Sequence, residues 1–162
     1  MRQEMIAGHC REVCGACGYV HYRNPLPVAS SIVVNDAGEV LLVRRRNEPS
    51  RGEWCLPVGF AETGETIRQA ALRKLLEETG IEGEILSLVD VESEENPFYG
   101  DMLFVTFAVA KKAGVEAAGD DADDVGYFLL QRAPALAFRA QELALQTYRE
   151  GLARSCGPKN TP

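Results

Sequence analysis

Carboxylates gather in one short, glycine-containing stretch of this chain, residues 59–81. Glu65 follows Gly59 in what reads as a loop, and Glu77 and Glu78 stand next to each other further along. Carboxylate and carbonyl oxygens are the ligands that hard cations such as Mg²⁺ or Mn²⁺ take, and a glycine lets the backbone approach a ligand closely. The alternative is a solvated helix face, which is the more common origin of a run of charges.

Residues 67–79 of this stretch are expected to form a helix. Thr66 can cap its first turn, with Gln69 completing a capping box, and Gly80 can end it in a left-handed conformation. At about 100° per residue, one side of this helix is apolar and the other is charged. The apolar side comprises Ala71, Leu72, Leu75 and Leu76, and the charged side comprises Arg73, Lys74, Glu77 and Glu78.

The whole stretch resembles the Nudix box, a loop-helix-loop metal site with a glycine, a glutamate six positions later, and an Arg-Glu-apolar-x-Glu-Glu-x-Gly-apolar cluster. The matching residues are Gly59, Glu65, Arg73, Leu75, Glu77, Glu78, Gly80 and Ile81. The resemblance implies that the Gly59 carbonyl, Glu77 and Glu78 bind Mg²⁺ or Mn²⁺, with Arg73 orienting Glu77 and Glu65 supporting them. It also implies an α/β fold, the Nudix-type α/β/α sandwich with a mixed β-sheet.

Lys74 departs from this pattern, because it stands where the family has the first glutamate of the helix cluster. In the family that glutamate is commonly a metal ligand and in some members the general base. Lys74 and Glu78 are four residues apart and could pair, which would compete with metal binding. Two hypotheses follow: an enzyme with a thinned metal site, or a nucleotide-binding or regulatory Nudix domain that has lost catalysis.

A second acidic segment, residues 119–124, precedes a strand expected at 126–130. Taken alone it is a solvated loop. In Nudix enzymes a carboxylate from this part of the chain often completes the metal shell or acts as the base. Asp121 and Asp124 match that role best, and either could compensate for Lys74.

Other parts of the chain supply candidate substrate contacts. Arg44 and Arg46 end a strand near the box and could meet phosphate, although solvated arginines would look the same. Phe98 and Tyr99 lie in an expected acidic loop, residues 92–101, and could stack on a base or flavin; packing on their own strands is the alternative.

The strands expected around the box are bounded by turn residues. Residues 28–34 and 39–45 flank Asn35-Asp36-Ala37-Gly38 and predict a β-hairpin, and residues 83–91 and 102–110 predict two further strands. A final amphipathic helix is expected at about 139–154.

The N-terminal cysteines suggest half of a zinc site. Cys14 and Cys17 have the spacing of a zinc knuckle, to which Cys10 or His9 could add a third ligand and His21 or Cys156 a fourth. Free thiols on a degenerate ribbon fit the sequence equally well. The segment resembles the second half of the zinc ribbon that precedes the Nudix domain in NADH and FAD pyrophosphatase-like members, so Zn²⁺ is a further candidate cofactor.

Composition limits the classes of partner. The 162 residues are 46% hydrophobic and carry a net charge of −7, which suits one packed domain and argues against a nucleic-acid polymer as partner. No apolar run approaches membrane-spanning length and no signal peptide is visible, so we expect a cytoplasmic protein. The expected organisation is a ribbon-like segment (1–27), a Nudix domain (28–154) and a loose tail (155–162).

The resemblance finally implies an activity. It is the Mg²⁺-dependent hydrolysis of a nucleoside diphosphate linked to another moiety, with FAD, ADP-ribose or NADH favoured over nucleoside triphosphates. The partner would then be a small-molecule nucleotide, and family habit adds the expectation of a homodimer.

Overall fold

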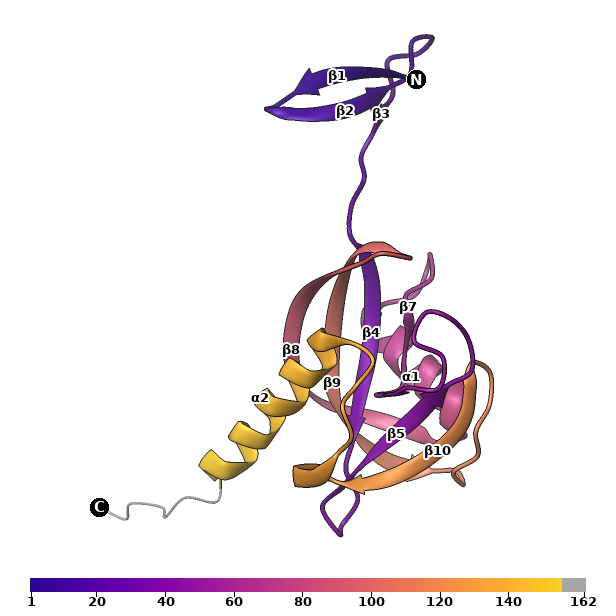
Figure 1. Ribbon diagram of the computed structural model, residues 1–162, viewed down its shortest axis with the longest axis vertical. Coiled ribbons are helices and arrows are strands. Elements are labelled where there is room, and N and C mark those ends of the chain that lie inside the picture. Colours follow the sequence, from indigo (N-terminus) through magenta and orange to yellow (C-terminus); the bar gives the residue numbers. More distant parts are fainter. Residues whose placement is uncertain (156–162) are drawn as a thin grey trace, which may run out of the picture.

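Two β-sheets with a helix on either side form the main body of the protein (Figure 1). The computed structural model describes residues 1–155. The elements are β1 (Arg2–Ile6), β2 (His9–Val13), β3 (Val20–His21), β4 (Leu26–Val33), β5 (Glu39–Arg45), β6 (Trp54–Cys55), β7 (Val58–Phe60), α1 (Ile67–Thr79), β8 (Glu82–Asn96), β9 (Gly100–Ala113), β10 (Ala122–Leu129), the 3-10 turn Leu130–Arg132 and α2 (Arg139–Ser155).

The larger sheet has the order β7-β4-β9-β8 and is mixed. β4 and β9 run parallel, from Leu26 opposite Met102 to Val33 opposite Val109, whereas β7 and β8 are antiparallel to their neighbours. The smaller sheet has the order β10-β5-β6 and is antiparallel throughout. The expected mixed sheet is therefore confirmed.

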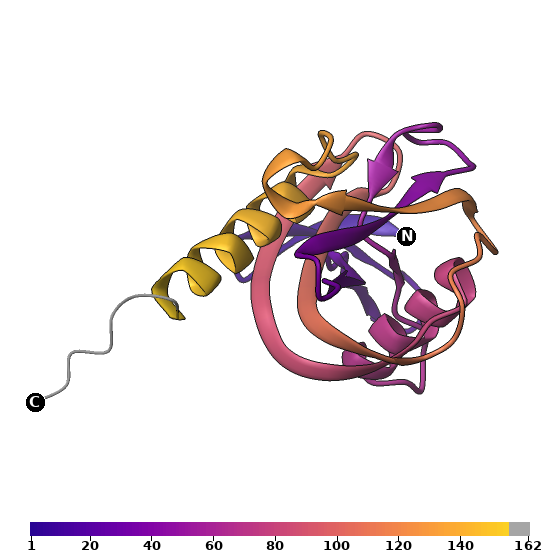
Figure 2. The ribbon, with the colours of Figure 1, turned by 90° about the horizontal axis from the view of Figure 1, so that it is seen from below.

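Alternation along β4 explains why the two helices lie on opposite faces. Ala29 and Val33 belong to the core cluster that includes Leu75 of α1, and Ile32 belongs to the cluster that includes Leu145 of α2. Because successive strand residues point to opposite faces, both sides of β4 are covered. Figure 2 shows the strands between the two helices, which confirms the α/β/α layering.

The hairpin expected from residues 28–45 is wrong, although the turn between its strands forms. Asn35 N–H donates to the Glu39 carbonyl, and Val34 and Val40 make an isolated bridge. Beyond that bridge the strands diverge, because β4 pairs with β7 and β9 and β5 pairs with β10 and β6. Each strand is buried on both faces and finds distant partners that the local pattern does not reveal.

The loop expected at residues 92–101 is mostly strand. β8 continues to Asn96 and β9 begins at Gly100, with Glu92 opposite Phe104 and Asn96 opposite Gly100. The connection is therefore a tight turn, which the Asn96 side chain stabilises by accepting the N–H groups of Phe98 and Tyr99. The glutamates that suggested a loop lie along β8, the edge strand of the sheet.

Helix α1 has the predicted bounds and caps. The Thr66 side chain accepts the Gln69 N–H, the Gln69 side chain accepts the Thr66 N–H, and Gly80 ends the helix at φ 72°. The predicted faces need one correction, because Leu76 is 47% exposed and Glu78 is only 4% exposed. The helix therefore turns Glu78, rather than Leu76, toward the interior.

The N-terminal segment forms its own three-stranded sheet, in the order β1-β2-β3, and Figure 1 shows it standing apart from the body. The hydrogen bond from Gly18 N–H to the Cys14 carbonyl closes the turn between β2 and β3. Among residues 1–155, no helix is long and apolar enough to cross a membrane. The expected tail lies outside the described residues from Cys156 onward.

Candidate active site

Arg73 connects the loop of the box to helix α1. Its guanidinium donates to both oxygens of Glu65, at 2.6 and 3.0 Å, and to the Phe60 carbonyl at 3.1 Å. It also donates to both oxygens of Glu77, at 3.2 and 3.3 Å. These hydrogen bonds lower the pKa of Glu65 to about 2, so this carboxylate is ionised at neutral pH. Arg73 thus fixes the loop and orients Glu77 at once.

Lys74 forms a bridge of its own from the same helix. Its Nζ lies 2.9 Å from Glu77 and 2.8 Å from Asp120, and the side chain is 16% exposed. Burial lowers the pKa of Lys74, but the hydrogen bonds with Asp120 and Glu77 outweigh burial and leave the pKa above its usual value. Lys74 does not form the pair considered with Glu78; its partners are Glu77 and a residue 46 positions along the chain.

Glu78 is the buried carboxyl of the site. One of its oxygens accepts the Val58 N–H at 3.0 Å. Burial raises its pKa to about 8, although that hydrogen bond and the charge of Lys74 act in the opposite direction. A buried acid of this kind binds a proton at neutral pH unless another positive charge takes the proton's place.

The segment between β9 and β10 returns to the end of α1. Ala117 N–H donates to the Thr79 carbonyl and Gly119 N–H donates to the Glu78 carbonyl, which pairs two helix-terminal acceptors. A Cβ at Gly119 would lie 2.6 Å from the Glu77 carbonyl oxygen, so the close approach requires glycine. The consequence is that Asp120 and Asp121 come to lie beside the helix carboxylates.

Residues that follow β5 hold this acidic segment from the other side. Arg46 donates to the carbonyls of Asp120 and Ala122 at 2.9 and 2.8 Å, and to the Asp123 carboxylate at 3.0 Å. Asn47 donates to the Asp121 carboxylate at 2.7 Å. The segment is thus clamped between the end of β5 and the end of α1.

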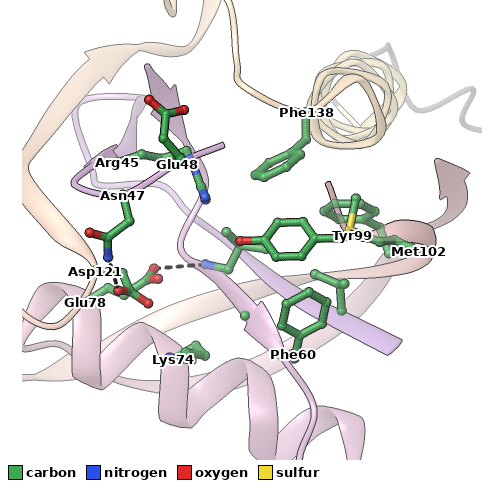
Figure 3. Close-up of a pocket in the computed structure, with 14 residues that line it drawn as sticks. Arg45, Asn47, Glu48, Phe60, Lys74, Glu78, Tyr99, Met102, Asp121 and Phe138 are labelled. Atoms are coloured by element: carbon green, nitrogen blue, oxygen red, sulfur yellow. Dashed lines mark hydrogen bonds between the residues drawn. The ribbon is translucent and has the colours of Figure 1, made fainter. Parts of the chain in front are cut away.

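These elements surround a cavity of about 170 Å³. Its lining comprises Val28, Arg45, Asn47, Glu48, Val58, Gly59, Phe60, Lys74, Glu78, Tyr99, Met102, Phe104, Asp121 and Phe138. Figure 3 shows Glu78 and Asp121 close together beside Asn47, with the rings of Phe60, Tyr99 and Phe138 across the cavity.

The aromatic end of the cavity is built from one edge-to-face pair and one tilted pair of rings. The ring centroids of Phe60 and Tyr99 are 5.1 Å apart, and those of Phe104 and Phe138 are 5.4 Å apart. The Arg45 guanidinium lies over the Phe138 ring, 5.0 Å from its centroid. A flat apolar surface with a cation beside it suits a ligand that has a ring and an anionic group.

The structure brings only some of the sequence-derived candidates to the cavity. Gly59, Glu78, Asp121 and Tyr99 line it. Arg73, Glu65 and Glu77 form the supporting ion-pair network outside the lining.

Four other candidates do not line the cavity: Arg44, Arg46, Phe98 and Asp124. Arg46 is engaged with the acidic segment, and Arg44 lies 3.5 Å from Asp124 with its guanidinium over Trp54. Phe98 is 69% exposed and packs edge-to-face on Tyr99.

The sequence reasoning missed the arginine that does reach the cavity. Arg45 stands between Arg44 and Arg46, so strand alternation places it on the other face of β5. Phe138 was also missed, because it immediately precedes α2, far from the box in sequence. The alternation was available from the sequence, whereas the approach of α2 was not.

The oxygen atoms at the polar end of the cavity fit one divalent cation that takes part of its coordination from a bound phosphate. No three histidine, cysteine, aspartate or glutamate side chains within residues 1–155 converge closely enough to hold a metal ion. Mg²⁺ commonly binds through one or two carboxylates, keeps several waters and takes the remaining oxygens from a phosphate. Glu78 and Asp121, with Gly59 beside them, supply a set of that size on one side of the cavity.

The N-terminal cysteines do not assemble a zinc site within the described residues. Cys10, Cys14 and Cys17 form no group that could hold a metal, and Cys10 instead donates to the Gln3 side chain. His21 pairs with Glu12 at 3.0 Å. The N–H groups of Cys17 and Ala16 lower the pKa of Cys14.

Comparison with known proteins identifies the family. The NUDIX domain model matches residues 25–149. The ADP-ribose pyrophosphatase of Methanocaldococcus jannaschii is 34% identical over 126 residues, which are 77% of this chain and 74% of that protein. The crystal structure of a NUDIX hydrolase from Nitrosomonas europaea superposes with a TM-score of 0.79 and 30% identity, covering 94% of this chain and 87% of that one. The chain therefore belongs to the Nudix family.

Similarity also extends beyond the family domain. The NAD-capped RNA hydrolase NudC of Stutzerimonas stutzeri is 28% identical over 151 residues, which are 93% of this chain, and the chain spans about half (53%) of that protein. Relatives that are pyrophosphatases and hydrolases support an enzyme, a Nudix hydrolase, over a binding domain without catalysis.

Proposed function

We propose that this protein hydrolyses the pyrophosphate of a nucleoside diphosphate linked to a second group, of the ADP-ribose, FAD or NADH class, with Mg²⁺ or Mn²⁺. One observation carries the proposal: a single cavity joins two carboxylates, Glu78 and Asp121, to an aromatic wall. The similarity to an ADP-ribose pyrophosphatase supports a linked diphosphate as the substrate.

The aromatic wall suits the ring of the substrate. Phe60, Tyr99 and Phe138 offer ring faces and edges on which a base can stack. Arg45, over Phe138, places a permanent positive charge between the aromatic end and the polar end. A pyrophosphate joined to a nucleoside would meet that charge when its base lies on the wall.

The polar end suits the pyrophosphate and its cation. We assign Glu78, Asp121 and the Gly59 carbonyl as the groups that hold Mg²⁺ or Mn²⁺. Glu77 is less accessible for this role, because it already binds Arg73 and Lys74. When bound, the cation neutralises phosphate charge and makes water a better nucleophile.

Hydrolysis adds one water molecule across a P–O–P linkage. The water oxygen forms a bond to one phosphorus, the bridging oxygen leaves with the other phosphate, and a carboxylate accepts the released proton. We assign the proton to the Asp121 oxygen that would not hold the cation; Asp121 lines the cavity, and Asn47 holds its carboxylate in place at 2.7 Å. The products are a nucleoside monophosphate and a phosphorylated remainder.

The test is a panel of ADP-ribose, FAD, NADH and nucleoside triphosphates with Mg²⁺, Mn²⁺ or EDTA, with products separated by chromatography. We expect turnover of a linked diphosphate by the wild type and a loss of about 1,000-fold in Glu78→Gln, an effect of about 4 kcal/mol on the barrier. The amide oxygen of the variant can still accept the Val58 N–H, so the fold should survive.

Asp124→Asn is the matched control. It removes a carboxylate from the same acidic segment, but Asp124 pairs with Arg44 and does not line the cavity. We expect its activity to stay within about threefold of the wild type. Equal losses in Glu78→Gln and Asp124→Asn would contradict the assignment of the cavity as the active site.

A further inference from the structure

Lys74 occupies an unusual position for a cation in a site that recruits metal. It lines the cavity, and its ammonium joins Glu77 of α1 to Asp120 of the acidic segment. These two carboxylates belong to different segments, and Lys74 is the cation that contacts both of them in the described part of the chain.

The surrounding charge explains what this ammonium contributes. Glu77, Glu78, Asp120 and Asp121 meet where the end of α1 and the acidic segment lie together. Carboxylates brought this close repel one another unless positive charge lies between them. A cluster of this kind takes cations from solution or finds one in the chain, and Lys74 provides one from the chain.

The lysine stem is positioned as firmly as its charge. A Cβ at Gly59 would lie 2.4 to 2.5 Å from three carbons of the Lys74 side chain, so the stem packs directly on the Gly59 backbone. Only glycine leaves room for it there. The ammonium is therefore held at the polar end of the cavity by packing and by two ion pairs.

We propose that Lys74 is a built-in counter-cation, which joins Glu77 to Asp120 before any divalent ion binds and leaves the side of Glu78 and Asp121 for a single divalent cation. The inference rests on the proposed function only in assuming that a divalent cation enters this cavity. Lys74 acts on the site as a positioning residue, because its ammonium contacts carboxylates rather than the reacting atoms.

The first test counts metal ions without reference to activity. Mn²⁺ is titrated into the full chain and the free ion is followed by electron paramagnetic resonance. The wild type should bind one Mn²⁺ per chain, and Lys74→Glu should bind a second ion, because it replaces the internal cation with a fifth carboxylate. Two or more ions in the wild type, with no change in Lys74→Glu, would overturn the proposal.

The second test measures melting temperature in EDTA and in Mn²⁺. Lys74→Met keeps a stem over Gly59 but removes the charge, so it should melt about 3 °C or more below the wild type in EDTA. Mn²⁺ should restore most of that loss. Lys112→Met, which removes an exposed lysine paired with Glu84, is the matched control and should melt like the wild type both in EDTA and in Mn²⁺. Identical melting of Lys74→Met and wild type in EDTA would reject the proposal.

Hydrolysis by the same preparations separates this proposal from the proposed function. A wild type that binds one Mn²⁺ and cleaves none of the linked diphosphates would reject the activity and support the role of Lys74. If the wild type cleaves its substrate and binds two ions, and Lys74→Glu also binds two, the role of Lys74 is rejected while the proposed activity stands.

Discussion

The carboxylates of the site come from two segments, one held by residues close to it in sequence and the other by residues far from it. In residues 59–81, Arg73 binds Glu65 eight positions before it and Glu77 four positions after it. In residues 119–124, the clamps are Arg46 and Asn47, which lie 74 to 77 positions away. The box is thus ordered by its own sequence, whereas the acidic segment is ordered by the completed fold.

This difference teaches where the site can fail. Substitutions inside the box remove ion pairs that also hold its loop in place, so activity and local stability should fall together. Damage to the clamps on the acidic segment should release Asp120 and Asp121 while the box remains intact. The predictions below test that separation, in order of expected effect.

Among the residues that hold the two segments, replacing Arg73 should produce the largest effect. Arg73→Ala leaves Glu65 and Glu77 without their shared cation and the Phe60 carbonyl without its donor. We expect kcat/KM to fall about 100-fold, which corresponds to about 2.7 kcal/mol, with most of the loss in kcat. Steady-state kinetics at several Mg²⁺ concentrations would measure it.

Arg68→Ala is the control for that experiment. Arg68 lies on the same helix, with its guanidinium 5.1 Å from the centroid of the Phe107 ring and no role in the box. Its kcat/KM should stay within about twofold of the wild type. A similar loss in both variants would show that any arginine substitution on α1 lowers kcat/KM, and that the ion-pair network of Arg73 is not the cause.

Replacing Arg46 should have a smaller effect of a different kind. Arg46→Ala removes three side-chain hydrogen bonds to residues 120–123 but touches no residue of the box. We expect activity to fall about tenfold and the Mg²⁺ concentration for half-maximal activity to rise, because Asp121 is less well placed. Metal-dependence curves at saturating substrate would show the shift.

Arg44→Ala serves as the neighbour control for Arg46. Its ion pair with Asp124 is 3.5 Å long and half-exposed, so its contribution is small. The metal dependence should match that of the wild type. If Arg44→Ala and Arg46→Ala shift it equally, the acidic segment is not held by Arg46 in particular.

Features that depend on nearby residues were predicted from the sequence, whereas those that depend on distant residues were not. The bounds of α1, its capping box and the left-handed Gly80 were predicted correctly, because all depend on residues a few positions apart. The burial of Glu78 was not predicted, since it depends on Val58 and on the segment that packs over the helix end. Helical periodicity alone assigned Leu76 to the interior instead.

Longer-range features failed for a related reason. The turn at residues 35–38 looks like a hairpin turn, but β4 and β5 each pair with strands far along the chain. The end of the strand suggests Arg44 and Arg46 as phosphate contacts, which stays a prediction, whereas Arg45 is the arginine that lines the cavity. Pairing partners and strand faces are fixed by tertiary packing, which local patterns do not contain.

The capping box allows the local segment to be weakened without touching its chemistry. Thr66→Ala removes the acceptor for the Gln69 N–H at the start of α1. We expect a loss of about 1 kcal/mol in the free energy of unfolding, measured by urea denaturation, with kcat/KM unchanged. A fall in activity without a fall in stability would mean that Thr66 serves the site directly.

The smallest effect concerns the anchor of the distant segment. Glu116 accepts hydrogen bonds from Lys111, at 2.7 Å, and from the Tyr127 hydroxyl, at 2.8 Å, where the chain leaves β9 for the acidic residues. These bonds lower the pKa of Glu116 to about 2, from an ordinary value of 4.5. A carboxylate with a lowered pKa stabilises the fold fully above its unfolded value, and that stability is lost as the pH falls from about 4.5 toward 2.

Glu116→Gln should therefore be slightly less stable than the wild type at pH 7, and the difference should shrink across that acid window. The effect is modest because the ion pair is partly exposed and screened by solvent. Unfolding midpoints of both proteins between pH 7 and pH 3 would measure the convergence. Parallel pH curves would show that the anchor of the acidic segment does not depend on the charge of Glu116.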